Sequence, residues 1–344
     1  MKIKSAIIGY GRNGSSMHAE PFEALKEEFE LVAVCDIDPA AKKNAKKRFG
    51  CRTYSSYKQM LKKEDLDFAV IVTRTDQHQK MACDCLAAGI NVLITKPWAK
   101  DAAEAKKMII ASKKSGAKLL PWLPARFGID LKRIKEIIDG GAIGKVFQVK
   151  RLENTFGIRI DWQTESKYGG GYLLNWGPHM IDQPLQLTDS PVESVYGDLK
   201  QIINPGDVED NFIVITKTED GTTFISEFTI AAKGQPNWVV QGSKGTIFVY
   251  DENIEIHKIT QPEAFDPMRY RNPVEIEVIK ETLSNDVYLL GDTVTVYKHI
   301  AKALRGEEAY YVTPESALEL SKLLDAVKKS SKSGKVVKLL SVKE

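Results

Sequence analysis

The sequence predicts a two-domain α/β protein, with a first domain over residues 1–123 and a second over residues 124–344. Three observations predict this fold class. The chain has 344 residues, which is more than one typical hydrophobic core holds. Apolar runs alternate with charged helical patterns up to about residue 123, which is typical of a parallel sheet covered by helices on both faces. Beyond that point the pattern changes to successive strands, so we expect a second sheet there.

Five apolar runs supply the strands expected in the first domain: residues 3–9, 30–36, 66–73, 91–95 and 117–123. Four charged helical patterns separate them: residues 40–50, 56–65, 77–89 and 103–116. Several of these patterns end in glycine, the residue that most often stops a helix. Ligands of such sheets bind at the carboxyl ends of the strands, so we expect functional residues there.

A glycine motif follows the first apolar run. Gly9, Gly11 and Gly14 match G-x-G-x-x-G between a predicted strand and a predicted helical segment. Glycines there let the backbone approach a pyrophosphate, and a helix N-terminus would add amide donors. Arg12 and Asn13 lie inside the loop and are assigned to the same ligand. The motif predicts a Rossmann-type dinucleotide-binding domain; a tight surface turn is the alternative.

The second apolar run ends in a candidate ribose-binding residue, Asp36, 22 residues after Gly14. Its carboxylate would accept hydrogen bonds from the ribose hydroxyls of the adenosine. It would also repel a 2′-phosphate, and Asp38 places a second acid nearby. We therefore expect NAD as the cofactor, with NADP less favoured. A surface aspartate with no ligand is the alternative.

Two more strand ends carry candidate cofactor contacts. Thr73 and His78 lie at and just after the end of the third run, and Lys96 and Pro97 follow the fourth. Most lysines are surface charges, but one that closes a central strand of such a sheet should face the cofactor. A lysine with a pKa near ~10.4 is a poor base, so burial or a nearby positive charge must lower that pKa. Oxidised nicotinamide carries such a charge.

Residues 169–182, GGGYLLNWGPHMID, combine three successive glycines with polar side chains in an apolar stretch. The polar side chains are Asn175, His179 and Asp182. If a helix begins near Gly171, these three fall at i, i+4 and i+7 and share one face. Pro178 is comfortable only in a first helical turn, so the helix could instead begin nearer Trp176. We expect the glycines to let the backbone approach the nicotinamide or the substrate, and the polar face to meet the substrate. The alternative is a core histidine satisfied by Asp182.

With these motifs the chain resembles the Gfo/Idh/MocA family, the relatives of glucose–fructose oxidoreductase and inositol dehydrogenase. The shared motifs occur in family order over essentially the whole chain: the glycine loop, TKP at 95–97, the GGG…H…D block, GSKGT at 242–246 and the closing segment 314–337. The resemblance implies an N-terminal dinucleotide-binding domain and a C-terminal α/β domain with a large, mostly antiparallel, open-faced sheet. It also implies oxidation or reduction of a hydroxyl or ketone on a sugar, inositol or related polyol.

The resemblance assigns the family's catalytic lysine to Lys96 and its catalytic histidine to His179. Three positions depart from the family pattern: Asn175 stands where Asp is usual, Thr95 where Glu is usual, and Arg74 where Pro is common. An asparagine can hold a substrate hydroxyl but brings no negative charge to support a protonated histidine. These departures leave the reaction type in place and the substrate open.

The predicted reaction is hydride transfer between a substrate carbinol carbon and nicotinamide, while a base removes the hydroxyl proton. His179, with an ordinary pKa near ~6.5, is the better candidate base at neutral pH, and Lys96 would polarise the oxygen or share the proton. The sequence leaves open which of the two takes the proton. Candidate substrate contacts are Asn175, Asp182, Asp161, Trp162 and Tyr168, although aromatic residues usually only pack.

Three functional classes fit these motifs. The favoured class is an NAD(P)-dependent dehydrogenase that acts on CH–OH groups of a sugar, glycoside or polyol. The second is a glycosidase that uses tightly bound NAD in a transient oxidation and elimination, which would release sugar without net NADH. The third is a non-catalytic NAD-binding sugar sensor. The presence of both Lys96 and His179 argues against a sensor, since a sensor needs no proton-transfer pair.

The second domain is expected to hold strands at residues 145–154, 192–203, 211–218, 222–232, 237–242 and 246–259. Residues 219–221 and 242–245 predict hairpin turns, and helices are expected near 285–305 and 314–333. An antiparallel sheet of this kind often leaves one face open. We therefore expect a homodimer or homotetramer that covers this face.

The amino-acid composition limits the classes of molecule that we expect the protein to bind. Basic and acidic residues number 49 and 46, and a net charge of +3 gives no reason to expect nucleic acid. No run approaches the ~20 apolar residues of a membrane helix, and the N-terminus lacks a signal-peptide cleavage pattern. The cysteines are Cys35, Cys51, Cys83 and Cys85, and their spacing fits neither a metal site nor a disulfide framework. We expect buried helix thiols at Cys83 and Cys85, and a cytoplasmic enzyme with a small-molecule substrate and no metal.

Overall fold

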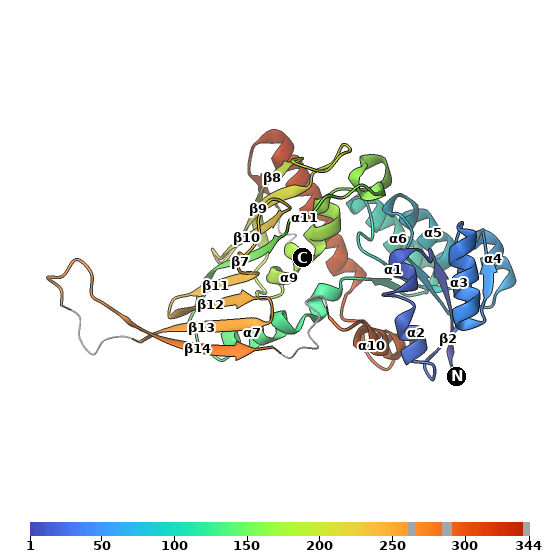
Figure 1. The fold of residues 1–344 in the computed structure, drawn as a ribbon, viewed down its shortest axis with the longest axis horizontal. Coiled ribbons are helices and arrows are strands. Elements are labelled where there is room, and N and C mark those ends of the chain that lie inside the picture. Colours follow the sequence, from blue (N-terminus) through green and yellow to red (C-terminus); the bar gives the residue numbers. More distant parts are fainter. Residues whose placement is uncertain (261–265, 284–290, 340–344) are drawn as a thin grey trace.

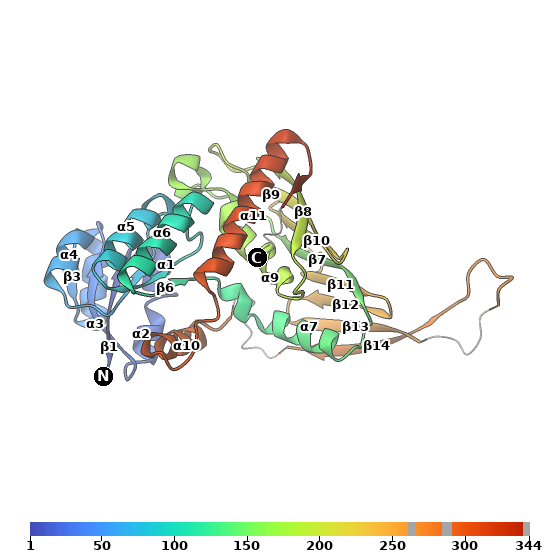
Figure 2. The same ribbon diagram turned by 180° about the vertical axis from the view of Figure 1, so that it is seen from behind.

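The computed structural model describes residues 1–260, 266–283 and 291–339. Two sheets lie at opposite ends of the molecule, with the helix α11 (Pro314–Ser333) between them (Figures 1 and 2). The predicted division between residues 123 and 124 falls between the last strand of the first sheet and the short helix η1 (Pro124–Phe127). One continuous apolar core joins side chains of the first sheet to side chains of α11 and of the second sheet.

The first sheet is the predicted parallel sheet. Its six strands are β1 (Ile3–Ile8), β2 (Phe29–Cys35), β3 (Arg52–Tyr54), β4 (Phe68–Ile71), β5 (Asn91–Ile94) and β6 (Leu119–Pro121). They pair in the order β3-β2-β1-β4-β5-β6. The strand order reverses between β1 and β4, which is where ligands of open α/β sheets bind. The five predicted strands are confirmed. β3 was not predicted, because three partly exposed residues make no apolar run.

The predicted helices of the first sheet are confirmed as α3 (Pro39–Phe49), α4 (Tyr57–Lys63), α5 (Thr75–Ala87) and α6 (Ala102–Ser115). Local capping sets the bounds of two of them. Asp38 and Asp101 accept backbone N–H groups at the N-termini of α3 and α6. Gly50 and Gly116 adopt left-handed conformations at the C-termini, as the sequence pattern indicated. On α5, Cys85 is buried as expected, but Cys83 is only partly buried.

The helical segment predicted after the glycine loop is short. It spans one turn, α1 (Arg12–Ser15), and a second short helix, α2 (Glu20–Ala24), follows it. Pro21 occupies the first turn of α2, and proline there begins a helix because its missing N–H is not needed. Backbone amides of the loop itself, more than a long helix dipole, therefore face the ligand region.

Over the described residues the second sheet has nine strands: β7 (Val146–Asn154), β8 (Val192–Lys200), β9 (Asn211–Thr218), β10 (Thr223–Thr229), β11 (Trp238–Gly242), β12 (Gly245–Tyr250), β13 (Asn253–Thr260), β14 (Glu275–Thr282) and β15 (Val337–Lys338). All neighbours are antiparallel except β7 and β10. The hairpins at 219–221 and 242–245 are confirmed. The predicted strand 246–259 is two strands, which turn at Asp251 with φ of 50°. β14 and β15 were not predicted.

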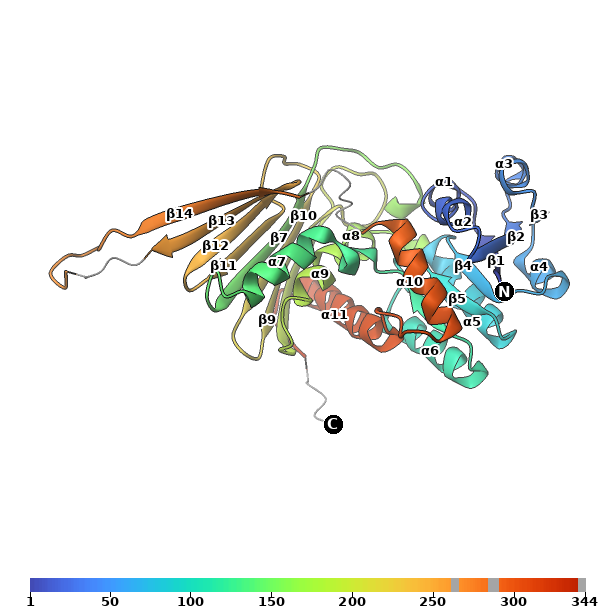
Figure 3. The same ribbon diagram turned by 90° about the horizontal axis from the view of Figure 1, so that it is seen from below.

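Helices cover one face of the second sheet. α7 (Ile129–Asp139), α9 (Asp182–Leu185) and α11 lie along the same side of its strands (Figure 3). The predicted helix 314–333 is confirmed, whereas α7 was not predicted. Of the predicted helix 285–305, the structure contains α10 (Thr293–Arg305), and residues 285–290 lie outside the described ranges. α10 packs against α2 and the core of the first sheet, so the C-terminal part of the chain returns to the first domain.

No helix within the described ranges is both long and apolar enough to cross a membrane. The same ranges hold no group of three or more His, Cys, Asp or Glu side chains arranged to bind a metal ion.

Candidate active site

A cavity of about 560 Å³ lies at the carboxyl ends of β1, β2, β4 and β5. Its size is in the usual range for a small-molecule site. Ten of the predicted site residues line it: Gly9, Gly11, Arg12, Asn13, Asp36, Thr73, His78, Lys96, Pro97 and Trp162. The strand ends therefore bring together predicted residues from Gly9 to Pro97, which are 88 positions apart in the chain, and Trp162 of the second domain joins them.

The glycine loop presents bare backbone to this cavity. Gly9 has φ of +95°, and a Cβ there would lie 2.8 Å from the carbonyl oxygen of Val72. A Cβ on Gly14 would overlap the carbonyl oxygen of Gly9, so only glycine allows the backbone to pack this closely against the turn. Gly14 does not line the cavity. A Cβ on Gly11 would meet no atom within 4 Å. The loop thus leaves open space over its amides, which is what a dinucleotide pyrophosphate requires.

The Asp36 carboxylate is fixed at the end of β2 by two backbone donors. Oδ2 accepts the N–H of Tyr10 at 2.6 Å, and Oδ1 accepts the N–H of Asp38 at 2.8 Å. Each oxygen keeps a second lone pair that can accept a ribose hydroxyl. Asp38 has a different role, because its carboxylate caps α3 by accepting the N–H of Ala40 at 2.9 Å.

Several residues that line the cavity were not predicted: Ser55, Ser56, Tyr57, Gln77, Met81 and Gln163. The first three directly follow β3 at its carboxyl end. The strand-end rule would have found them if that short strand had been recognised. Gln77 lies in the first turn of α5 and Met81 one turn later on the same face. Neither closes an apolar run, so the strand-end rule does not predict them.

Lys96 lies at the point where the cavity meets the second domain. The Lys96–Pro97 peptide bond after β5 is cis. The Lys96 Nζ donates to Asn175 Oδ1 at 2.8 Å and to the Asn175 backbone oxygen at 3.1 Å. His78 holds the backbone at this peptide bond: its Nδ1 lies 2.8 Å from the Pro97 oxygen, and its Nε2 lies 2.9 Å from the Thr73 oxygen. Burial, with the positive charge of Arg159, lowers the pKa of Lys96 to about 7.

Asn175 and His179 lie one turn apart on α8 (Tyr172–Met180). This helix begins directly after Gly171 and contains Pro178 in its interior, so the alternative start near Trp176 is wrong. His179 is 1% exposed, and neither ring nitrogen has a hydrogen-bond partner within the described part of the chain. Burial and the positive charges of Lys96 and Arg151 hold the pKa of His179 well below its usual range.

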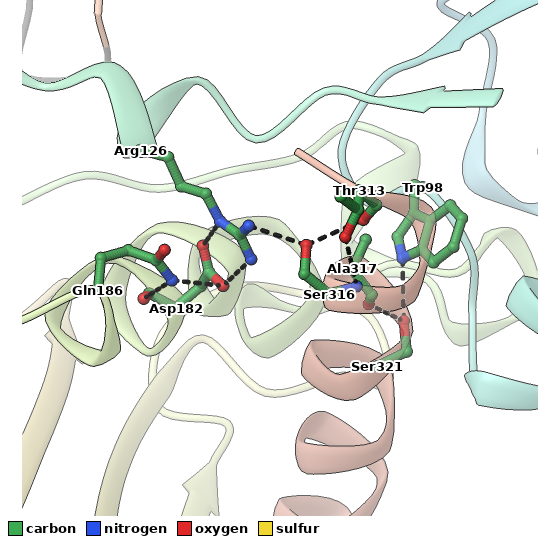
Figure 4. Close-up of polar contacts among 8 residues, drawn as sticks. All are labelled: Trp98, Arg126, Asp182, Gln186, Thr313, Ser316, Ala317 and Ser321. Atoms are coloured by element: carbon green, nitrogen blue, oxygen red, sulfur yellow. Dashed lines mark hydrogen bonds and ion pairs between the residues drawn. The ribbon is translucent and has the colours of Figure 1, made fainter. Parts of the chain in front are cut away.

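Asp182 does not join the polar face of α8. The helix ends at Met180, and Asp182 begins the next short helix, α9, so the expected i+7 position is lost. Its carboxylate instead accepts two hydrogen bonds from Arg126, at 2.8 and 2.7 Å (Figure 4). The structure thus contradicts the alternative in which Asp182 satisfies His179, because the Asp182 carboxylate is bonded to Arg126 and both His179 ring nitrogens lack a partner among the described residues.

The segment from Arg159 to Tyr168 covers the cavity from the second domain. Asp161 accepts two hydrogen bonds from Arg159, at 2.8 and 3.0 Å, and lies 3.7 Å from Arg12 of the glycine loop. The Tyr168 ring stacks on the guanidinium of Arg74, 4.0 Å from the ring centroid. Asp161 and Tyr168, expected to contact a sugar, are therefore engaged by basic side chains, two of which belong to the first domain.

The three glycines at 169–171 allow close packing at the end of the segment that covers the cavity. Gly169 has φ of +71°, and a Cβ there would lie 2.9 Å from the Cβ of Thr75 on α5. A Cβ on Gly170 would overlap the carbonyl oxygen of Gln163, and one on Gly171 would overlap the carboxylate of Glu209. The glycines therefore let the segment lie against α5 and against itself. Our expectation that they open space for nicotinamide or substrate is replaced by this packing role.

Comparison with known protein families identifies the class of this protein. Residues 3–121 match the oxidoreductase family with an NAD-binding Rossmann fold, and residues 131–248 match the GFO/IDH/MocA C-terminal domain. The protein therefore belongs to the Gfo/Idh/MocA family of oxidoreductases, as its motifs indicated.

Three similar proteins illustrate the relationship. The chain is 22% identical to scyllo-inositol 2-dehydrogenase (NADP(+)) of Bacillus subtilis over 98% of this chain and 96% of that protein. Among solved structures, an NAD-binding protein from Listeria innocua is 26% identical, with a TM-score of 0.83, over 98% of this chain and 97% of that one. The WlbA dehydrogenase of Bordetella pertussis, solved with NADH and UDP-GlcNAcA, is 22% identical, with a TM-score of 0.81, over 99% of this chain and all of that one.

Proposed function

We propose that the protein is an NAD-dependent dehydrogenase that transfers a hydride between nicotinamide and a hydroxyl-bearing carbon of a sugar, glycoside or polyol. One observation carries this proposal. The amine of Lys96 reaches into the cofactor cavity and bonds to α8, the helix that carries the unpartnered His179. Lys96, which lines the cavity of an NAD-binding fold, is thus bonded to the helix that carries a second group able to exchange a proton, and its charge reaches that group, His179.

The residues present fit NAD. The open space over Gly11 suits the pyrophosphate, and the oriented carboxylate of Asp36 suits a ribose diol. When bound, NAD⁺ supplies the acceptor for the hydride. Since the Asp36 carboxylate would repel a 2′-phosphate, we expect NAD to bind more tightly than NADP.

Lys96 and His179 would act on the substrate oxygen. A protonated Lys96 donates a hydrogen bond to a carbonyl oxygen and stabilises the negative charge that develops there during reduction. His179 has two ring nitrogens free of protein partners among the described residues, so it can bond to a substrate hydroxyl at low cost. The segment from Arg159 to Tyr168 contributes Trp162 and Gln163 to the cavity wall, where they would shield a bound substrate from part of the solvent.

The relatives support the substrate class. An inositol is the named substrate of the Bacillus subtilis relative, and a UDP-linked sugar acid is bound in the WlbA structure. Both ligands are rich in hydroxyl groups. These names favour a sugar or polyol as the substrate of this protein.

The test is to mix the purified protein with NAD and a panel of inositols, free sugars, polyols and glucosides, and to follow nicotinamide absorbance. Reduction of NAD by one class of compound supports the proposal and identifies the substrate class. Cleavage of a glucoside without net NADH would replace it with the glycosidase alternative. Sugar binding without either reaction would identify a sensor and overturn the proposal.

We also infer that the protein forms a homodimer or homotetramer through the open face of the second sheet. In the strand register, Ile215, Ile225, Val239 and Phe248 lie in one row on the side opposite the helices, and Lys150 of β7 stands between Ile225 and Val239. The most exposed apolar side chains of this face are Ile215, Tyr250, Ile259, Ile276 and Val278. An apolar face of this kind is stable in water when a second copy covers it.

The free thiols support a reducing compartment, and we propose that the protein is cytoplasmic.

A further inference from the structure

The bond between Lys96 and Asn175 has a chemical consequence beyond positioning. Both oxygens that accept from the Lys96 Nζ, Oδ1 and the backbone oxygen of Asn175, are uncharged. Within the described ranges, no carboxylate lies within 4.0 Å of this nitrogen. A carboxylate would stabilise the ammonium form of this partly buried lysine, whereas an amide oxygen accepts its hydrogen bond without neutralising the charge.

The other groups around Lys96 add no compensating charge of their own. The charged and titratable side chains that influence it are His179 on α8 and Arg159, which is bonded to Asp161. The Trp176 ring centroid lies 5.9 Å from the Nζ, at the outer limit of a cation–π contact. Arg159 repels the ammonium, and its own partner Asp161 is shared with Arg12.

His179 is poorly placed to become a cation. Its ring is 1% exposed and has no carboxylate partner among the described residues, since Asp182 is bonded to Arg126. Protonation would create a buried positive charge close to those of Lys96 and Arg151. A general base must carry the proton that it removes. A protonated Lys96 keeps two oxygen acceptors on Asn175, whereas a protonated His179 has no acceptor for either N–H among the described residues. This arrangement therefore disfavours His179 as the base.

We propose that Asn175 is the positioning residue that makes Lys96, and not His179, the group that exchanges a proton with the substrate hydroxyl. The inference deepens the proposed function and rests on it. In the oxidation, the substrate O–H bond breaks, its proton forms a new N–H bond on the neutral amine of Lys96, and the carbon–oxygen double bond forms. The hydride that leaves the same carbon carries both electrons to NAD⁺, so the substrate is oxidised and the cofactor is reduced. His179 stays neutral and holds the substrate oxygen by a hydrogen bond.

The first experiment measures the titration of Lys96 without substrate. The amines are labelled competitively with acetic anhydride at a series of pH values, and the peptide that contains Lys96 is quantified by mass spectrometry. In the parent protein Lys96 should titrate near pH 7. Asn175→Asp places a carboxylate beside the amine and should raise this pKa by about 1 to 3 units. The control Asn44→Asp adds the same charge on an exposed position of α3 and should leave the Lys96 titration unchanged.

The second experiment measures kcat for oxidation against pH, with the substrate that the panel identifies. The rate should rise with pH through the pKa of Lys96, because the neutral amine is the base. Asn175→Asp should move this rise to higher pH by the same amount as the labelling titration. His179→Gln should lower kcat at least tenfold but leave the midpoint of the rise in place. Asn175→Ala should lower kcat without moving the midpoint upward, which covers the case in which the aspartate variant fails to fold.

Two results would overturn the inference. One is a Lys96 that titrates near its ordinary value in the parent protein, or that Asn175→Asp fails to move. The other is a rate profile whose rise shifts or disappears in His179→Gln while the Lys96 titration is unchanged. If every compound on the panel leaves NAD unreduced, the hydride-transfer function fails, and the labelling titration still decides whether Asn175 controls the charge on Lys96.

Discussion

Arg126 and Asp182 form a buried ion pair with two hydrogen bonds, in which the side chains are 6% and 5% exposed (Figure 4). Arg126 also donates to the Ser316 hydroxyl on α11 at 2.9 Å. Farther along the same helix, Ser321 accepts from the indole N–H of Trp98 at 2.9 Å. The network therefore joins α9, which directly follows the His179 helix, to α11 and to the turn after Lys96.

Breaking this pair on one side should strongly destabilise the protein. Asp182→Asn leaves the Arg126 charge buried without a partner, which costs about 3–5 kcal/mol in comparable cases. The free energy of unfolding in urea is the measurement. The double variant Arg126→Met, Asp182→Leu should recover most of the loss, because it removes both charges. Glu319→Gln, which breaks the exposed pair with Lys322, is the matched control and should cost under about 1 kcal/mol. Equal small losses for the buried and exposed pairs would contradict this account.

Lys96→Ala should abolish turnover without abolishing cofactor binding. The variant removes the amine that faces the substrate oxygen, and loss of such a group lowers kcat by about 10²–10⁴-fold. The cofactor cavity keeps its glycine loop and Asp36, so the Kd for NAD should change by less than about threefold, equivalent to under about 1 kcal/mol. Steady-state kinetics and fluorescence titration measure the two quantities. The control Lys106→Ala removes an exposed charge on α6. Unchanged turnover in Lys96→Ala would remove this residue from the mechanism.

Asp36→Ala should weaken NAD binding more than NADP binding. The variant removes the acceptor for the ribose hydroxyls and the repulsion of a 2′-phosphate at the same time. We expect the ratio of the two Kd values to shift toward NADP by at least tenfold. Asp38→Ala is the control, since that carboxylate caps α3 and its loss should cost about 1 kcal/mol of stability with no change in cofactor preference. An unchanged preference in Asp36→Ala would exclude it from the ribose site.

Gly169→Ala should loosen the segment that covers the cavity. The new Cβ would occupy a left-handed backbone conformation and lie 2.9 Å from Thr75. Gly221→Ala is a matched control, because Gly221 has φ of +88° and a Cβ there would meet no atom within 4 Å. The control should lose about 1 kcal/mol from backbone strain alone. Gly169→Ala should lose more stability and should also raise the Kd for NAD, as measured by calorimetry. Equal effects of the two variants would show that the contact with Thr75 is unimportant.

Charge on the open sheet face should prevent assembly. Ile215→Lys and Val278→Lys each place an ammonium on the outward side of the second sheet. Sedimentation velocity should show these variants as smaller species than the parent protein, since burying an unpaired charge costs several kcal/mol. Ile110→Lys changes an isoleucine of α6 that is 65% exposed and away from this face, and should keep the parent assembly. A parent protein that sediments as a monomer would overturn the oligomer inference.

The cofactor half of the site could be predicted from local sequence because parallel strands end at one edge. Gly9, Asp36 and Lys96 each close or follow an apolar run, and the structure places all three around one cavity. The prediction failed for Ser55, Ser56 and Tyr57, because β3 is three residues long and partly exposed, so its end left no signal in the hydrophobic pattern.

Hydrophobic pattern and motifs were enough to predict the fold class, the strand-end positions of the cofactor residues, and Lys96 and His179 as candidate catalytic residues. The pairing of the polar groups could be known only from the folded chain. Helical periodicity placed Asn175, His179 and Asp182 on one face, but the chain bends after Met180 and Asp182 pairs with Arg126, 56 residues away. Asn175 accepts a hydrogen bond from Lys96, which lies 79 residues earlier in the chain. His179 has no hydrogen-bond partner among the described residues. Periodicity describes one helix, whereas the partner of a buried charge depends on which distant segment packs against it, and that is decided by the whole core.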